Sequence, residues 1–233
     1  MEILLISNST NAGEEYLAHC IDSISDFLET RKKAVFIPFA AVTFSYDDYE
    51  NKVKEKFARI NQDVVSIHKF KDYKKALKEA EAIVVGGGNS FVLMQELLEN
   101  DLMSIIKEKV QKGTPYIGWS AGSNVACPTI RTTNDMPIVE PQSFNSIGLI
   151  DFQINPHYLD ANPEGHAGET REQRLEEFLV KNQNIYVVGL REGTMLEIKG
   201  KEIKLIGKRN ARIFKYGIEP KELSPNDDFS FLI

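Results

Sequence analysis

The chain has little cysteine, no excess of basic charge and no long apolar run, and each shortage excludes a class of protein. Only two cysteines occur among 233 residues, so there is no disulfide framework or metal-ligand spacing, which favours a reducing compartment. The 28 Lys and Arg are outnumbered by 34 Asp and Glu, giving a net charge of -6, and nothing in this balance attracts a nucleic acid. No apolar run approaches the roughly 18 residues of a membrane span, and the amino terminus does not fit a signal peptide. We therefore expect a cytoplasmic protein with no nucleic-acid or membrane partner.

The first half of the chain alternates short apolar runs with amphipathic stretches. With 42% hydrophobic residues, the chain can bury one substantial core, and we expect a single domain over residues 1–233. Strands with little internal polarity, separated by helices, are typical of a parallel sheet covered on both faces. The pattern predicts strands at 3–7, 34–38, 64–68, 82–85 and 114–117, and helices at 13–30, 47–60, 73–80, 90–99 and 102–111.

The second half departs from this alternation. Residues 128–146 contain three prolines and a Thr-Thr-Asn-Asp cluster, which indicates a long loop, and such loops are usually functional or mobile. A short strand at 151–155, a helix at 171–181 and four short strands follow. These four, at 185–190, 195–199, 202–206 and 211–216, predict an antiparallel tail on the edge of the sheet. The expected fold is therefore a doubly wound, mostly parallel α/β sheet with helices on both faces and antiparallel strands near the C-terminus.

The segment from Gly118 to Gly122 has the form Gly-x-Ser-x-Gly and lies between a predicted strand and a helical stretch. A serine on such a sharp turn is lifted out of the fold, with its hydroxyl exposed to substrate. The two glycines let the backbone turn tightly and leave room for a reacting carbonyl. Ser120 is therefore the candidate nucleophile, and the question becomes which acyl group it attacks.

A serine hydroxyl becomes a good nucleophile when a neighbouring base takes its proton, and the chain offers four histidines. His157 follows a predicted strand and Pro156, which places it at the carboxyl edge of the sheet, where catalytic groups gather in open α/β folds. His19 and His68 are more simply surface or packing residues, and His166 lies in a Gly-rich loop. We therefore predict His157 as the base.

The histidine needs a carboxylate that fixes its tautomer and stabilises its charged form. Asp135 lies between Ser120 and His157 in the chain, and Glu192 follows the predicted strand 185–190 to the same carboxyl edge. Chain order does not decide between them, because such a triad is recognised by its geometry. Glu192 has the better placement, while Asp135 is equally suited to bind a positively charged substrate amine. Both stay candidates.

The oxyanion of the intermediate needs backbone N–H donors. Ala121, the residue after the nucleophile, is expected to supply one, and Gly88, in the glycine turn at 86–89, a second. Asn89, the last residue of this turn, is an expected substrate contact. The turn lacks the third glycine of a dinucleotide fingerprint and the Gly-Lys-Ser/Thr of a P-loop, so phosphate binding is weakly supported, and a structural glycine turn is the alternative. We expect no cofactor and no metal.

Arg171 carries a separate signal. Thr170 and Gln173 have the Thr-x-x-Gln spacing of a capping box, which predicts that a helix begins at Arg171. The helix dipole disfavours a cation at this position, so an arginine here makes a strong site for a ligand carboxylate. From the residues alone, pairing of Arg171 with Glu169 or Glu172 is the simpler explanation.

Six segments of the chain form a recognisable set. They are 36–40 (FIPFA), 84–89 (VVGGGN), 116–123 (YIGWSAGS), 126–137 (ACPTIRTTNDMP), 154–157 (INPH) and 168–174 (GETREQR). Together they resemble the peptidase E family of α-aspartyl dipeptidases within the S51 serine peptidases. The resemblance covers essentially the whole chain, is most specific after Ser120 and is weakest beyond Gly200.

The resemblance implies a metal-independent serine dipeptidase that hydrolyses dipeptides with an amino-terminal aspartate (Asp-Xaa), on a fold related to class I glutamine amidotransferases. It matches Ser120 to the nucleophile and His157 to the base, and both candidate carboxylates to the third position. It also gives Arg171 a role, which is to bind the aspartate side chain of the substrate. Amidotransferases use a cysteine and a His-x-Glu pair, whereas this chain has a serine and Leu159 at the place of that glutamate, which argues against amidotransfer.

Two other functions stay open at this point. A related serine hydrolase would act on another acidic substrate, such as a cyanophycin-type polymer or an ester, as a cyanophycinase-like enzyme does. A non-catalytic protein would bind acidic metabolites in the same pocket. The sequence is compatible with a monomer or a homodimer.

Overall fold

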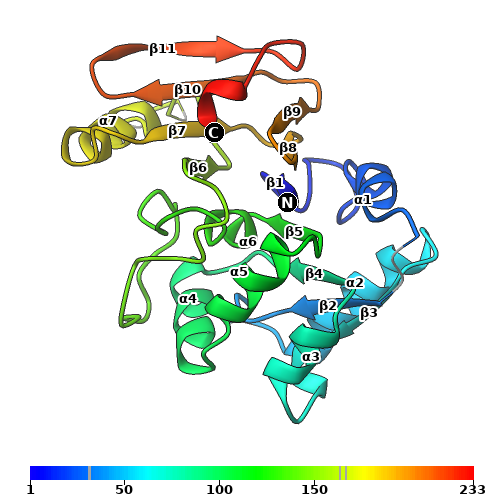
Figure 1. Ribbon diagram of the computed structural model, residues 1–233. Coiled ribbons are helices and arrows are strands. Elements are labelled where there is room, and N and C mark those ends of the chain that lie inside the picture. The colour runs from blue at the N-terminus through cyan, green and yellow to red at the C-terminus, as the bar shows by residue number, and fades with distance from the viewer. Residues whose placement is uncertain (31–32, 163, 166) are drawn as a thin grey trace.

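A seven-stranded sheet forms the centre of the computed structural model, which describes residues 1–30, 33–162, 164–165 and 167–233 (Figure 1). Five of its strands are parallel, and two antiparallel strands continue the sheet beyond β1. In spatial order the strands are β3 (Asp63–Ser66), β2 (Lys33–Ile37), β4 (Ala82–Val85), β5 (Tyr116–Trp119), β1 (Glu2–Ile6), β8 (Met195–Lys199) and β9 (Glu202–Ile206). The predicted mostly parallel α/β fold is confirmed.

Helices cover both faces of this sheet. Successive residues of a strand point to opposite faces, and in β2 Phe36 packs into one core cluster while Ile37 packs into the other. Among the described residues, two helices pack on the face of Phe36, and three longer helices and the short α6 (Ala121–Asn124) pack on the face of Ile37. The first group is α1 (Ile21–Leu28) and α2 (Tyr46–Ala58), and the second is α3 (Tyr73–Glu79), α4 (Ser90–Glu99) and α5 (Met103–Gln111). A short 3-10 helix, η1 (Ile67–Lys69), follows β3.

A second sheet, built from strands of the C-terminal half, is seen above β1 in Figure 1. Its order is β11 (Ile218–Leu223), β10 (Ala211–Lys215), β7 (Tyr186–Leu190) and β6 (Gln153–Pro156). Helix α7 (Arg171–Lys181) packs on it through Leu175 and Leu179, and the 3-10 helix η2 (Ser230–Leu232) ends the chain. The predicted antiparallel tail is therefore divided. Within the described residues, β8 and β9 extend the large sheet, whereas β7 pairs with β6 and β10 in the second sheet.

The predicted helix at 13–30 is mostly wrong, since only residues 21–28 are helical. Leu17 has a φ of +58° and Gly13 a φ of +78°, and left-handed residues cannot continue a right-handed helix. The N–H of Leu17 donates to the carbonyl of Ser9 at 2.6 Å instead. The amphipathic spacing of this segment comes from a turn that buries Tyr16, Leu17 and Cys20.

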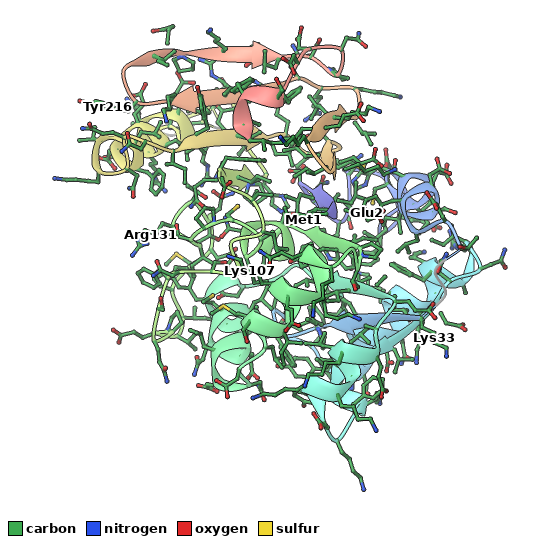
Figure 2. All side chains as sticks on the ribbon, in the orientation of Figure 1. Met1, Glu2, Lys33, Lys107, Arg131 and Tyr216 are labelled. Atoms are coloured by element: carbon green, nitrogen blue, oxygen red, sulfur yellow. The ribbon has the colours of Figure 1, made fainter. Side chains whose placement is uncertain are left out.

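The long loop after the short helix α6 (Ala121–Asn124) follows the prediction for 128–146. Its path is fixed by hydrogen bonds rather than by strands, such as that from the N–H of Thr129 to the side chain of Gln153 at 3.2 Å. Arg131, labelled in Figure 2, lies with its guanidinium 5.4 Å from the centre of the Phe144 ring. Across the described ranges, no helix is long and apolar enough to cross a membrane.

Candidate active site

Ser120 lies on the tight turn between β5 and α6. Its φ is +52°, a left-handed conformation that is unfavourable for a residue with a Cβ. The two flanking glycines are required by space, because a Cβ on Gly118 would lie 2.4 Å from the carbonyl oxygen of Gly122, and one on Gly122 would lie 2.2 Å from that of Val85. The N–H of Ser120 donates to the carbonyl of Ile6 at 3.0 Å. The predicted sharp turn is therefore held by close packing against the neighbouring strands.

His157 connects Ser120 to a carboxylate. Its Nε2 lies 2.9 Å from the Ser120 Oγ, and its Nδ1 lies 2.7 Å from Oε1 of Glu192. The side chains of His157 and Glu192 are 38% and 41% exposed, so the pair is accessible to a small substrate. In this arrangement Nδ1–H donates to the carboxylate, which leaves Nε2 free to take the proton of the serine hydroxyl.

Asp135 lies elsewhere. Its Oδ2 accepts hydrogen bonds from the N–H of Ser90 at 2.7 Å and from the Thr133 hydroxyl at 3.0 Å. Ser90 is the first residue of α4, where a carboxylate is favoured by the free N–H groups and the helix dipole. Of the two carboxylates left open by the sequence, Glu192 is thus the one that contacts His157, while Asp135 binds a helix N-terminus.

The glycine turn before α4 lies directly against the serine. A Cβ on Gly87 would lie 3.0 Å from the Ser120 Cβ, and one on Gly88, whose φ is +137°, would lie 2.1 Å from the carbonyl oxygen of Ala40. Glycine is therefore needed at both positions. In the described part of the chain, the N–H groups of Gly88 and Ala121 donate to no protein acceptor. They are thus free to bind a ligand, and the predicted role of Gly88 and Ala121 as oxyanion donors stays a prediction.

Asn89 has a structural role in addition to any contact with substrate. Its N–H donates to the carbonyl of Ala40 at 2.9 Å. Its side-chain oxygen accepts from the N–H groups of Phe91 and Val92, and its amide nitrogen donates to the carbonyl of Met136 at 2.9 Å. These are the contacts of a helix N-cap, so the side chain is already bound within the protein. The expected substrate contact of Asn89 stays a prediction.

Tyr49 of α2 supports this turn and was not singled out from the sequence. Its hydroxyl donates to the carbonyl of Gly87 at 3.0 Å and accepts from the indole N–H of Trp119 at 3.0 Å. The side chain is buried, which raises the pKa of Tyr49. It therefore joins the glycine turn to the residue before Ser120. A tyrosine on the apolar side of a helix has the same pattern as ordinary core, so no local signal distinguishes this role.

Arg171 is the first residue of α7, and the predicted capping box between Thr170 and Gln173 is present. The guanidinium of Arg171 donates to the side-chain oxygen of Asn134. The amide nitrogen of Asn134 donates in turn to the carbonyl of Pro156 at 2.6 Å, next to His157. Burial, with a smaller contribution from Arg174, lowers the pKa of the Arg171 guanidinium. This contact with Asn134 therefore links the arginine to the end of the strand that carries the histidine.

The simpler explanation for Arg171, an ion pair with a neighbour in sequence, is wrong. Glu172 binds Arg212, with Oε2 2.7 Å from its Nε, and Glu169 lies 3.9 Å from Arg174. Among the residues that the structure describes, Arg171 has no carboxylate partner. It is a half-buried cation that a ligand carboxylate can neutralise.

The other histidines lie outside this hydrogen-bonded series. His68 binds Asp47 and the Ser66 hydroxyl, and burial lowers the pKa of His19 in the turn before α1. His166 lies outside the described residues. Asp47, Glu50 and His68 offer atoms within 4.8 Å of one another. Such a group has the donors of a metal site, but lysines already bind its carboxylates, namely Lys69 on Asp47 and Lys54 on Glu50.

Comparison with known proteins identifies the family. The model of "Peptidase family S51" matches residues 3–206. The chain belongs to this family. Two curated relatives are both named "Peptidase E". The one from Nostoc sp. is 55% identical over 99% of this chain and 96% of its own length, and the one from Salmonella typhimurium is 46% identical over 98% of this chain and 100% of its own. The expected class of enzyme, a serine dipeptidase, is confirmed.

The fold is also found in a solved structure. A peptidase from an acI-B1 Actinobacterium superposes with a TM-score of 0.72 over 99% of this chain and 96% of that one, at 20% sequence identity. At this identity the likeness concerns the fold alone. It agrees with the mixed α/β architecture described above.

Proposed function

We propose that this S51 peptidase hydrolyses dipeptides that begin with aspartate, by way of an acyl-enzyme on Ser120. The observation that carries the proposal is the hydrogen-bonded series from the Ser120 Oγ through His157 to Glu192, at 2.9 and 2.7 Å. A base in contact with the nucleophile, and a carboxylate in contact with the base, are the parts needed for acyl transfer at neutral pH.

In the first step Ser120 Oγ attacks the carbonyl carbon of the substrate aspartate. His157 Nε2 takes the hydroxyl proton, and Glu192 stabilises the resulting imidazolium. The oxyanion accepts hydrogen bonds from the N–H groups of Ala121 and Gly88. The C–N bond then breaks as His157 returns the proton to the leaving amine. Water, activated by the same histidine, hydrolyses the ester and releases aspartate.

Arg171 supplies the selectivity for aspartate in this proposal. Its guanidinium is half-buried and has only the amide of Asn134 as a hydrogen-bond partner in the described structure. A carboxylate that pairs with it forms a charge-assisted and potentially bidentate contact. Substrates with an uncharged first residue would leave this half-buried cation unpaired, which is unfavourable. Glutamate would place its carboxylate one methylene too far from the attacked carbonyl.

Hydrolysis of Asp-Leu, Glu-Leu, Asn-Leu and Ala-Leu in the presence of EDTA tests this function, with Ser120→Ala as the inactive control. Cleavage of Asp-Leu alone, abolished in Ser120→Ala and unaffected by EDTA, is the expected result. Full activity of Ser120→Ala would refute the acyl-enzyme. Turnover of other acidic esters or polymers without Asp-Leu cleavage would assign a different substrate. Ligand-induced thermal stabilisation with no turnover would assign a binding role.

Arg171→Met, compared with Arg174→Met on the same helix, tests the selectivity. Loss of a charge-assisted contact of about 1.5–3 kcal/mol lowers kcat/KM for Asp-Leu by roughly 10- to 150-fold. Arg174→Met removes a nearby positive charge whose pairing with Glu169 is exposed, and it should change little. Equal losses of kcat/KM in both variants would mean that Arg171 acts only by adding positive charge near the site, without direct contact with the substrate carboxylate.

The proposal also covers the cellular compartment and the oligomeric state of the protein. Both cysteines are free and buried, which fits a reducing compartment, and we place the protein in the cytoplasm. Ser120, His157 and Glu192 all come from one chain, so a monomer is sufficient for this chemistry, and a homodimer is compatible with it.

A further inference from the structure

The three residues of the hydrogen-bonded series come from two different sheets. Ser120 follows β5 of the large sheet, whereas His157 follows β6 and Glu192 follows β7 of the second sheet. The distance between the nucleophile and the base therefore depends on how firmly the two sheets are joined at this point. Strand β1 lies beside β5 in the large sheet, and Figure 1 shows it on the side that faces β6.

Ser7, the residue after β1, joins the sheets with one side chain. Its hydroxyl donates to the carbonyl of Leu190 at 2.7 Å and accepts from the N–H of His157 at 2.9 Å. Its own N–H donates to the carbonyl of Thr194 at 3.0 Å. Leu190 and Thr194 flank Glu192 at two residues on either side. The fully buried hydroxyl of Ser7 is thus bound both to the backbone of the base and to the turn that carries its carboxylate partner.

Asn8 holds the same turn from the next position. Its side-chain oxygen accepts from the N–H of Gly193 at 2.7 Å, and its amide nitrogen donates to the carbonyl of Thr10 at 2.9 Å. Asn8 is 1% exposed, so these bonds form away from solvent and fix the side chain. Gly193 directly follows Glu192. Ser7 and Asn8 therefore form hydrogen bonds with the backbone on both sides of Glu192.

The backbone of His157 makes this support necessary. Its φ is +52°, which is unfavourable for a residue with a side chain and persists only where surrounding contacts enforce it. The hydrogen bond from its N–H to Ser7 is such a contact. Without this acceptor, the partly buried N–H would lose its protein partner, and the backbone would gain by rotating away from the left-handed region. That rotation would move the imidazole relative to Ser120.

We propose that Ser7 is a positioning residue for the catalytic base, with Asn8 in a supporting role, and that it acts by locking the His157 and Glu192 segments of the second sheet onto the sheet that carries Ser120. Ser7 does not touch the reacting atoms in this role. The kinetic part of its test rests on the proposed function, while the spectroscopic part does not.

The test compares Ser7→Ala with Ser66→Ala, a matched control. Ser66 is also a fully buried serine at the carboxyl end of a strand of the large sheet, and its hydroxyl is also hydrogen bonded. Displacement of a catalytic group by about 1 Å can cost about 10²-fold in rate. Ser7→Ala should therefore lower kcat for Asp-Leu about 10²-fold with little change in KM, and Ser66→Ala should leave both unchanged. In Ser7→Cys, whose sulfur is a weak hydrogen-bond acceptor, kcat should fall less than in Ser7→Ala. In Asn8→Ala, kcat should fall about tenfold.

The second readout is the low-field proton resonance of His157 Nδ1–H in its bond to Glu192, assigned by its loss in His157→Gln. We expect it to disappear or move upfield in Ser7→Ala and to persist in Ser66→Ala, both shown to be folded by cooperative thermal unfolding. Wild-type kcat and an unchanged resonance in Ser7→Ala would overturn the proposal, as would an effect confined to KM. If the wild type cleaves no Asp-dipeptide, the proposed function fails, and the resonance alone decides the role of Ser7. If Ser7→Ala does not fold, Ser7→Cys and Asn8→Ala decide it in the same way.

Discussion

Replacing Glu192 by glutamine isolates the carboxylate that contacts His157, because the two side chains have nearly the same shape. The Nδ1–Oε1 distance of 2.7 Å places the centres of an imidazolium and a carboxylate about 4 Å apart, where the attraction is about 1 kcal/mol in bulk water and about 4 kcal/mol at an effective dielectric constant of about 20. Both side chains are roughly two-fifths exposed, so solvent screening keeps the value between these limits, at about 2–3 kcal/mol. A loss of this size slows turnover about 30- to 150-fold.

The glutamine amide adds a second effect in the same direction. It can donate to Nδ1, which favours the tautomer with its proton on Nε2, and that nitrogen then cannot take the Ser120 proton. Asp135→Asn is the matched comparison, because an asparagine oxygen can still accept from the N–H of Ser90. We expect that variant to keep kcat within about threefold of the wild type.

The assay is kcat and KM for Asp-Leu at neutral pH for the wild type and both variants, with Ser120→Ala as the background. A rise in KM for Asp135→Asn with kcat preserved would assign Asp135 to the substrate amine. The reasoning is refuted if Asp135→Asn loses as much turnover as Ser120→Ala while Glu192→Gln stays near the wild type.

Three further predictions concern other parts of the chain. Gly88→Ala should lower the melting temperature and abolish turnover, because its Cβ would lie 2.1 Å from the carbonyl of Ala40 at a φ of +137° and the strain alone costs about 1–3 kcal/mol; wild-type stability would contradict this. Arg191 forms ion pairs with Asp160 and Glu222 and thereby lowers the pKa of both carboxyl groups. These ion pairs therefore contribute to the free energy of unfolding above the unfolded-state pKa of the two groups, and this contribution is lost as the pH falls through the folded-state values. Arg191→Gln should therefore cost about 1 kcal/mol at neutral pH and less in acid, as measured by urea unfolding at both pH values. The two cysteines are buried and each has its pKa raised to about 12, so neither should react with a thiol reagent until the protein unfolds.

The parallel core and the sharp turn that carries Ser120 could be predicted from the sequence because their signals are local. An apolar run between helical stretches is enough to predict a buried strand, and the glycines around Ser120 are required by contacts within the turn and its adjacent strand. His157 and Glu192 were found through their positions just after predicted strands. The first helix was predicted to begin too early because the apolar spacing of residues 13–20 is that of a helix, although Leu17 has a left-handed backbone.

Which of Asp135 and Glu192 contacts His157 could not be predicted from the sequence, for a different reason. It depends on where the second sheet lies relative to the first, which is set by strand pairing between distant segments. The pattern predicted one extended sheet edge, and on that basis both carboxylates were within reach of His157. The support of the site by Ser7 and Tyr49 is hidden in the same way, because a serine at a strand end and a tyrosine in a helix are common in any core.

The left-handed backbone of Ser120 also has a consequence for the stability of the whole chain. A non-glycine residue in this region costs about 1–3 kcal/mol, whereas glycine adopts it without steric strain, and its larger loss of conformational entropy on folding offsets only about 0.5–1 kcal/mol of this gain. Ser120→Gly should therefore yield an inactive protein that withstands heat and urea better than the wild type does. If so, selection for stable folding alone would favour glycine at position 120, and the proposed nucleophile would be lost. Continued activity would then need to be selected for in its own right.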